Sequence, residues 1–185
     1  TYPEVGQEYE FGEGSFTVLG PTQIRDDSNN NSVVVRLDYG DTSFLFTGDA
    51  ESKEEKDIIA ANEDLYCDVL SVGHHGSASS TSWDFLEAVL PEYAVISCGV
   101  NNSYGHPDPD TIEKLESIEA QIFRTDLQGN IIAISDGETI TWNNVPSNGE
   151  VLYAADFVSV KEEPNDTSST VGELGPGNQI QVLNR

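Results

Sequence analysis

Short apolar strands that alternate with helices constrain the fold of this chain more than any other feature of its sequence. β-Branched and aromatic runs predict strands at residues 33–39, 43–47, 67–72, 93–98, 121–124, 130–135 and 139–142. Periodic apolar positions and capping residues predict helices at 51–62, 82–89 and 110–119. This alternation is typical of an α/β fold, and a hairpin expected at residues 8–19 adds antiparallel strands at one end.

The composition changes near residues 143–149, which are rich in Asn, Pro, Ser and Gly. We therefore expect an α/β domain at residues 1–145 and a small all-β segment at 150–185. The longest apolar runs are far below the ~20 residues of a membrane span. Because Thr1 is not an initiator methionine, the chain is expected to be a fragment or a processed form.

Charge and cysteine content narrow the function classes. The net charge of −25 repels phosphate backbones and disfavours non-specific binding of nucleic acid. The alternative is that the acidity only keeps a secreted or salt-exposed protein soluble. Cys67 and Cys98 fall at opposite ends of neighbouring strands, so both are expected to be free.

Polar motifs with the residue types of a metal site follow three of the predicted strands. They are Gly48-Asp49, Gly73-His74-His75-Gly76 and Tyr104-Gly105-His106-Pro107, and they hold all three histidines of the chain. In open α/β sheets, functional sites lie at the carboxyl ends of the strands. The alternatives are structural: Asp49 could cap the following helix, and the histidines could be ordinary turn residues.

Carboxylate oxygen and neutral imidazole nitrogen are the ligands that zinc favours. The side chains of adjacent histidines diverge, so one of His74 and His75 is expected to bind metal. The other would support it or contact the substrate. His106, in a polar loop, suits an acid–base role.

The order and spacing of several motifs resemble the C-terminal half of metallo-β-lactamase-fold domains related to the ComEC-type DNA-uptake proteins. The similarity covers about residues 8–142. It is carried by Asn30-Asn31-Ser32, Phe44 to Asp49, Asp68 to Ser77, Ser97-Cys98-Gly99, Tyr104 to Pro107 and Arg124 to Gly129. The resemblance implies an αββα sandwich with a dinuclear centre, usually of zinc.

The resemblance also implies roles for individual residues. Asp49 would be the bridging carboxylate and, with His106, would take part in catalysis. His74 or His75 would complete this part of the metal site. Substrate would be bound near Asn31, Ser77 and Tyr104. Asp126 lies near the same edge of the predicted sheet without an assigned role.

One feature of the family is not found in this sequence. The family's His-x-His-x-Asp-His cluster, which supplies most of the other ligands, does not occur here. We therefore expect this chain alone to bind metal weakly or not at all, and a partner, either a missing N-terminal half or a second chain, to complete the site.

Residues 151–177 resemble the start of a bacterial SH3-like repeat, a module that often binds cell-wall polymer. This favours an extracellular or cell-surface setting in a bacterium. The expected activity is metal-dependent hydrolysis of a phosphoester or phosphodiester, with nucleic acid or a small wall-derived ester as substrate. The alternative is a non-catalytic wall-binding or scaffold protein with a remnant hydrolase fold.

Overall fold

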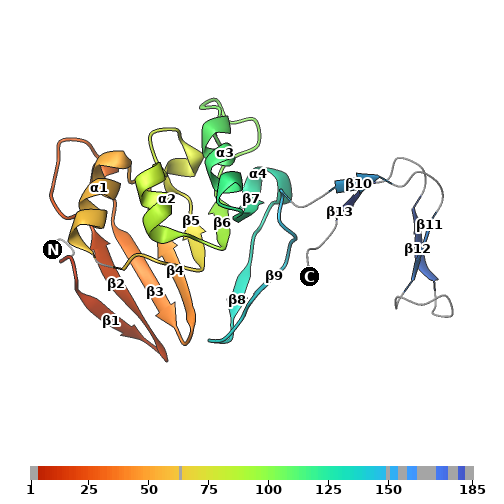
Figure 1. Cartoon of the computed structure of the whole chain (residues 1–185), viewed down its shortest axis with the longest axis horizontal. Helices are drawn as coiled ribbons and strands as arrows, with labels where there is room; N and C mark the ends of the chain where they lie inside the picture. The colour runs from red at the N-terminus through yellow and green to blue at the C-terminus, as the bar shows by residue number, and fades with distance from the viewer. Residues whose placement is uncertain are drawn as a thin grey trace. The chain divides into compact units, whose positions relative to one another are not determined.

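A seven-stranded mixed sheet forms the centre of the larger part of the chain (Figure 1). In this computed structural model the described residues are 4–62, 64–148, 151–153, 158–161, 170–174 and 179–181. The chain divides into two compact units, residues 1–148 and 149–185. The two units are treated separately below.

The strands of the sheet lie side by side in the order in which they occur in the sequence. They are β1 (Glu8–Phe11), β2 (Gly14–Gly20), β3 (Val34–Tyr39), β4 (Thr42–Phe46), β5 (Val69–Ser71), β6 (Tyr93–Ile96) and β7 (Gln121–Arg124). The pairs from β1 to β4 are antiparallel, and those from β4 to β7 are parallel. The predicted α/β fold with an antiparallel flank is confirmed.

Helices cover one face of this sheet. They are α1 (Ser52–Ala61), α2 (Trp83–Val89) and α3 (Pro109–Ser117), and each connects two adjacent parallel strands. Right-handed crossovers between strands added in one direction place all such helices on the same side. The core lies between, where Leu45, Leu70 and Ile96 of the sheet pack with residues of the helices such as Phe85 and Leu115. Burial of each of these large side chains contributes about 1.5–3 kcal/mol.

The opposite face of the sheet is also apolar. The strand register places Phe16, Leu37, Phe44, Val69 and Tyr93 in one row across five strands. A hairpin of β8 (Ala133–Ser135) and β9 (Ile140–Trp142) covers part of this face, with Trp142 stacked on Phe123 at 4.2 Å between ring centroids. Beside the hairpin lies a groove of about 500 Å³, lined by residues that include Phe44, Phe46 and Val95.

Three short helical segments were not predicted. They are η1 (Asn29–Asn31), η2 (Gly73–Gly76) and α4 (Thr125–Gln128). All three are too short to show a helical period in the sequence. The expectation of free thiols is confirmed for both cysteines.

The second unit is described only in its strands. β10 (Val151–Tyr153) pairs with β13 (Gln179–Gln181), and β11 (Val158–Lys161) pairs with β12 (Thr170–Leu174), both antiparallel. The SH3-like assignment of residues 150–185 falls largely outside the described residues and stays a prediction. Within the described residues of the whole chain, none of the helices is long and apolar enough to cross a membrane.

Candidate metal site at the carboxyl edge of the sheet

The loops that leave β4, β5 and β6 meet at one edge of the sheet because these strands are parallel (Figure 1). They carry Asp49, the pair His74-His75, and His106, so the sequence-predicted residues are brought to a common edge. Contacts between the loops hold them there. The His74 N–H donates to the Gly48 carbonyl at 2.9 Å, and the Asp108 N–H donates to the Gly76 carbonyl at 2.8 Å.

Asp49 lies in the turn between β4 and α1. Its N–H donates to the Ser32 hydroxyl at 3.1 Å, and Gly48 takes a positive φ of 56° that suits glycine. The N-cap of α1 is Glu51, two residues later. The alternative role of Asp49 as a helix cap is therefore excluded, and its carboxylate is 47% exposed at the sheet edge.

Both histidines of η2 have left-handed backbone conformations, His74 with φ 48° and His75 with φ 58°. Such a conformation costs about 1–2 kcal/mol for a residue with a side chain, so the surrounding contacts must hold the turn in place. The two rings are 6.2 Å apart between centroids and have different carboxylate partners. His75 pairs with Asp49, whereas His74 pairs with Glu51.

The His75 ring is oriented as a metal ligand would be. Its Nδ1 lies 2.7 Å from the Ser97 carbonyl, which can only accept, so Nδ1 carries the proton. In the neutral ring Nε2 then has its lone pair toward Asp49, with Oδ1 at 3.6 Å. Two ligands of one tetrahedral zinc ion, each about 2.1 Å from it, are about 3.4 Å apart. The pair therefore fits a shared cation, and the backbone bond to Nδ1 is the support that such ligands receive.

Glu51 forms the second carboxylate–imidazole pair, with Oε1 3.4 Å from His74 Nδ1. Ser79 donates to the same oxygen at 2.9 Å, and the Asn30 amide donates to the other at 3.1 Å. Burial works to raise the pKa of Glu51, but hydrogen bonds from Ser79, Asn29 and Asn30 outweigh it and hold the pKa below its ordinary value. Glu51 is therefore an anion beside His74.

His106 lies in the loop between β6 and α3. The Asn102 side chain ties this loop together, since it accepts from the His106 N–H at 3.0 Å and donates to the His106 carbonyl at 2.6 Å. The His106 ring is 5.7 Å from the ring of His74 and stacks on Tyr104, which is 82% exposed. A pocket of about 290 Å³ is lined by His75, His106 and Tyr104 together with neighbours of the loop, Ser97, Cys98, Gly99 and Asn102.

Other predicted residues have partners within the fold. The Asn31 amide exchanges two hydrogen bonds of 2.7 Å with the backbone of Arg25, so it shapes its own loop. Ser77 is nearly buried, and its hydroxyl is 3.0 Å from that of Ser79. Asp126 pairs with Arg124 at 2.7 Å, and hydrogen bonding to this guanidinium lowers its pKa. The substrate-binding roles of Asn31 and Ser77 stay predictions.

The pair of Asp49 and His75 would supply only two ligands to an ion. Among the described residues, no group of three or more His, Cys, Asp or Glu side chains is placed to hold an ion together. A structural zinc site takes four protein ligands, and a catalytic one takes three. The pair alone would therefore be only part of such a site.

Three contributors to this site were not predicted from the sequence: Glu51, Ser79 and the Ser97 carbonyl. In the sequence Glu51 is only the first residue of the helix expected at 51–62. Its partners Ser79 and Asn30 lie 28 and 21 residues away along the chain, so local pattern gives no signal for them. The Ser97 carbonyl has no sequence signature at all, because every residue has one.

Comparison with known proteins identifies the family of this chain. Residues 5–100 match the family model of the metallo-beta-lactamase superfamily. ComE operon protein 3 of Bacillus subtilis is 38% identical over 117 residues, which are 63% of this chain and 15% of that protein. Competence protein ComA of Neisseria gonorrhoeae is 38% identical over 125 residues, which are 66% of this chain and 18% of that protein.

Recombination protein 2 of Haemophilus influenzae is 36% identical over 133 residues, 71% of this chain and 16% of that protein. The chain thus spans less than a fifth of the length of each of these relatives. The family model covers the strands and turns that carry Asp49, His74 and His75, and ends before His106. On these grounds the chain belongs to the metallo-beta-lactamase superfamily.

Proposed function

We propose that this chain is part of a metal-dependent hydrolase that cleaves a phosphoester or phosphodiester. The observation that carries the proposal is the pair of Asp49 and His75, whose facing oxygen and nitrogen are 3.6 Å apart. With the Nδ1 proton of the neutral His75 ring held by the Ser97 carbonyl, both facing atoms are acceptors. A cation between them would relieve the repulsion between the two lone pairs.

The residues of this chain would divide the work as follows. Asp49 and His75 would hold a shared zinc ion, and Asp49 could reach a second ion with its other oxygen. When bound, the metal would act as a Lewis acid that activates water and polarises the phosphoryl group. His106 lines the adjoining pocket and would give a proton to the leaving group. Tyr104 would contact that group with its exposed ring.

The ligands that this chain lacks would come from a second half of the site. The apolar face of the sheet supports this, because parallel strands are ordinarily buried on both faces. The β8–β9 hairpin covers part of this face, and the groove beside it is lined by residues that include Leu37, Phe44 and Phe46. A partner sheet with a complementary apolar face would bury the groove and bring its own ligands to the edge that holds Asp49.

The relatives bear on the substrate class. One is named a competence protein and another a recombination protein, which supports nucleic acid as one class. The net charge of −25 opposes binding of a long polyanion to this chain. A short phosphodiester that reaches the pocket of His75 and His106 agrees with both the names of the relatives and the net charge of this chain. The cell-surface setting expected from residues 151–177 stays a prediction.

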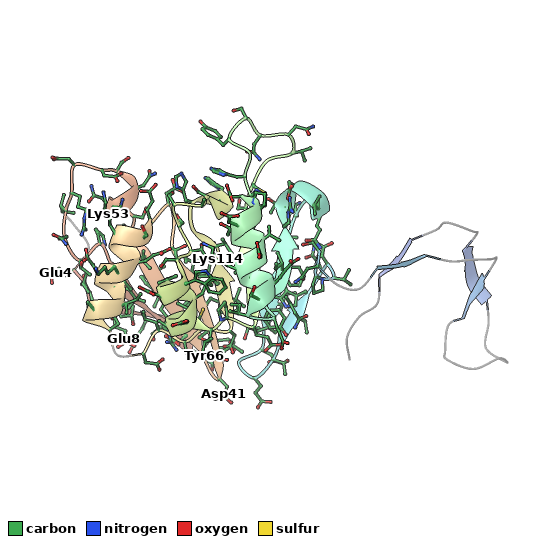
Figure 2. The ribbon with its side chains drawn as sticks, turned by 45° about the horizontal axis from the view of Figure 1, so that its top comes forward. Glu4, Glu8, Asp41, Lys53, Tyr66 and Lys114 are labelled. Atoms are coloured by element: carbon green, nitrogen blue, oxygen red, sulfur yellow. The ribbon has the colours of Figure 1, made fainter. Side chains whose placement is uncertain are left out.

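The proposal is tested with the full-length protein that contains this chain, loaded with zinc, and bis(p-nitrophenyl) phosphate as substrate. Asp49→Ala should lower kcat/KM at least about 100-fold, since it removes a ligand. Asp41→Ala is the matched control: Asp41 lies in the β3–β4 turn at the opposite end of the strands (Figure 2) and should leave activity unchanged. Full activity of the Asp49 variant would refute the assignment.

A further inference from the structure

Glu51 occupies a position at which a side chain ordinarily caps the helix. It is the N-cap residue of α1, where side chains that bond the first free N–H groups are preferred. The Glu51 side chain makes no such capping bond. It is turned instead toward η1 and the histidine turn, so a contact outside the helix determines its orientation.

Three side chains donate hydrogen bonds to the Glu51 carboxylate. Oε1 accepts from Ser79 at 2.9 Å and from Asn29 at 3.3 Å, and Oε2 accepts from Asn30 at 3.1 Å. Asn30 is itself fully buried, and its side-chain oxygen accepts from the Glu54 N–H at 3.1 Å. The carboxylate is therefore held in one place, 3.4 Å from His74 Nδ1.

These contacts determine which nitrogen of His74 carries the proton. Glu51 can only accept, and the Ser79 hydroxyl, 3.4 Å from Nδ1, already gives its proton to Glu51. The groups near Nδ1 thus offer it lone pairs, and Nδ1 must be the donor. In the neutral ring Nε2 is then left with the lone pair, on the edge of the ring away from Glu51.

We propose that Glu51 is a positioning residue that fixes His74 in the Nδ1–H form and so keeps Nε2 as a proton acceptor at the site. The assignment rests on the proposed hydrolase function, because the reacting substrate of that hydrolase is the partner that we assign to the Nε2 lone pair. It separates the two neighbouring histidines: His75 holds the ion with Asp49, whereas His74 accepts a proton or hydrogen bond from substrate. His106, 5.7 Å away between ring centroids, is the neighbouring imidazole.

The test is histidine-ring nitrogen NMR on this chain, which has only three histidines to resolve. At a pH where the rings are neutral, His74 should be in the Nδ1–H form in about tenfold excess or more, as a bond to a charged acceptor provides. Glu51→Ala should abolish that excess. Glu51→Gln should retain most of it, because the amide oxygen can still accept.

Two controls complete the design. Glu87→Ala, on the exposed side of α2, should leave the His74 ring signals unchanged. Asp49→Ala should also leave them unchanged while it removes the proposed metal ligand, so a failure of the hydrolase proposal is distinguishable from a failure of this one. The proposal is overturned if His74 of the unaltered chain is in the Nε2–H form. It is equally overturned if Glu51→Ala folds and keeps the Nδ1–H excess.

Discussion

At the scale of single residues, hydrogen bonds to ring nitrogens distinguish two histidines that the sequence leaves equivalent. His74 and His75 are the same residue type in the same turn, and either could be a ligand on pattern alone. The structure gives each ring a different acceptor for Nδ1, the Ser97 carbonyl for His75 and the Glu51 carboxylate for His74. Only His75 then directs a free nitrogen at Asp49.

Glu54 is a second residue whose environment has a measurable consequence. Its side chain on α1 is fully buried, and neither carboxyl oxygen has a hydrogen-bond partner among the described residues. Burial raises its pKa to about 7, against the opposing influence of the Ser32 backbone N–H and Arg25.

A raised pKa in the folded state makes stability depend on pH. The unfolded Glu54 ionises near pH 4.5, whereas the folded one keeps its proton until about pH 7. The contribution of Glu54 to the free energy of unfolding is therefore complete below pH 4.5 and is lost as the pH rises to 7. Glu54→Gln should remove this loss and be more stable than the unaltered chain at pH 8, by at most about 3 kcal/mol.

The effect is measured by urea unfolding of the unaltered chain and of Glu54→Gln, each at pH 4.5 and at pH 8. The difference between their free energies of unfolding should change from one pH to the other. Glu87→Gln, at an exposed position, corrects for general charge effects. Equal stability differences at both pH values would show that Glu54 ionises normally in the folded chain.

At the scale of elements, the turn η2 is locked against the loop that carries His106. Gly76 has φ +83°, and a Cβ at this position would lie 2.7 Å from the Cβ of Pro107 and 3.3 Å from Ile96. Both the backbone conformation and the close approach require glycine here. The position of His75 relative to His106 therefore depends on one residue without a side chain.

Gly76→Ala should lower the free energy of unfolding by about 3 kcal/mol, through the left-handed conformation and the clash together. Gly105→Ala is the matched control, since Gly105 has φ +77° but nothing within 4 Å of a Cβ, and it should lose only about 1 kcal/mol. Urea denaturation of both variants measures the difference. Similar losses in the two would mean that Pro107 does not restrict the turn.

The elements themselves were largely predictable. Residues 51–62 and 93–98 were expected as a helix and a strand, and α1 and β6 occupy 52–61 and 93–96, because capping and β-branched runs are local signals. The common edge that holds Asp49, His74, His75 and His106 was predictable, because the strands before these residues are parallel. The role of Glu51 was not predictable from the sequence, because it depends on contacts with Ser79 and with the asparagines of η1.

At the scale of the whole molecule, a highly acidic chain leaves one sheet face apolar. The row from Phe16 to Tyr93 crosses the sheet on the side away from the helices, and Phe46 remains 43% exposed there. An apolar groove of this kind on a chain with a net charge of −25 is typical of an interface rather than of a free surface.

The groove should bind an uncharged apolar dye such as Nile red, and Phe46→Asp should reduce that binding several-fold without unfolding the chain. An uncharged dye avoids repulsion by the acidic surface. Trp83→Asp, which changes a similarly exposed aromatic residue on α2, is the control and should leave dye binding unchanged. Equal dye binding by all three chains would mean that the groove is closed in solution.

The central claim is that Asp49 and His75, and not His74, share an ion. The most direct measurement is the zinc content of the full-length protein and of its His74→Ala and His75→Ala variants, purified side by side and assayed by elemental analysis. The account predicts that the His75 variant loses zinc, while the His74 variant keeps it. Retention of zinc by the His75 variant, with loss from the His74 variant, would contradict it.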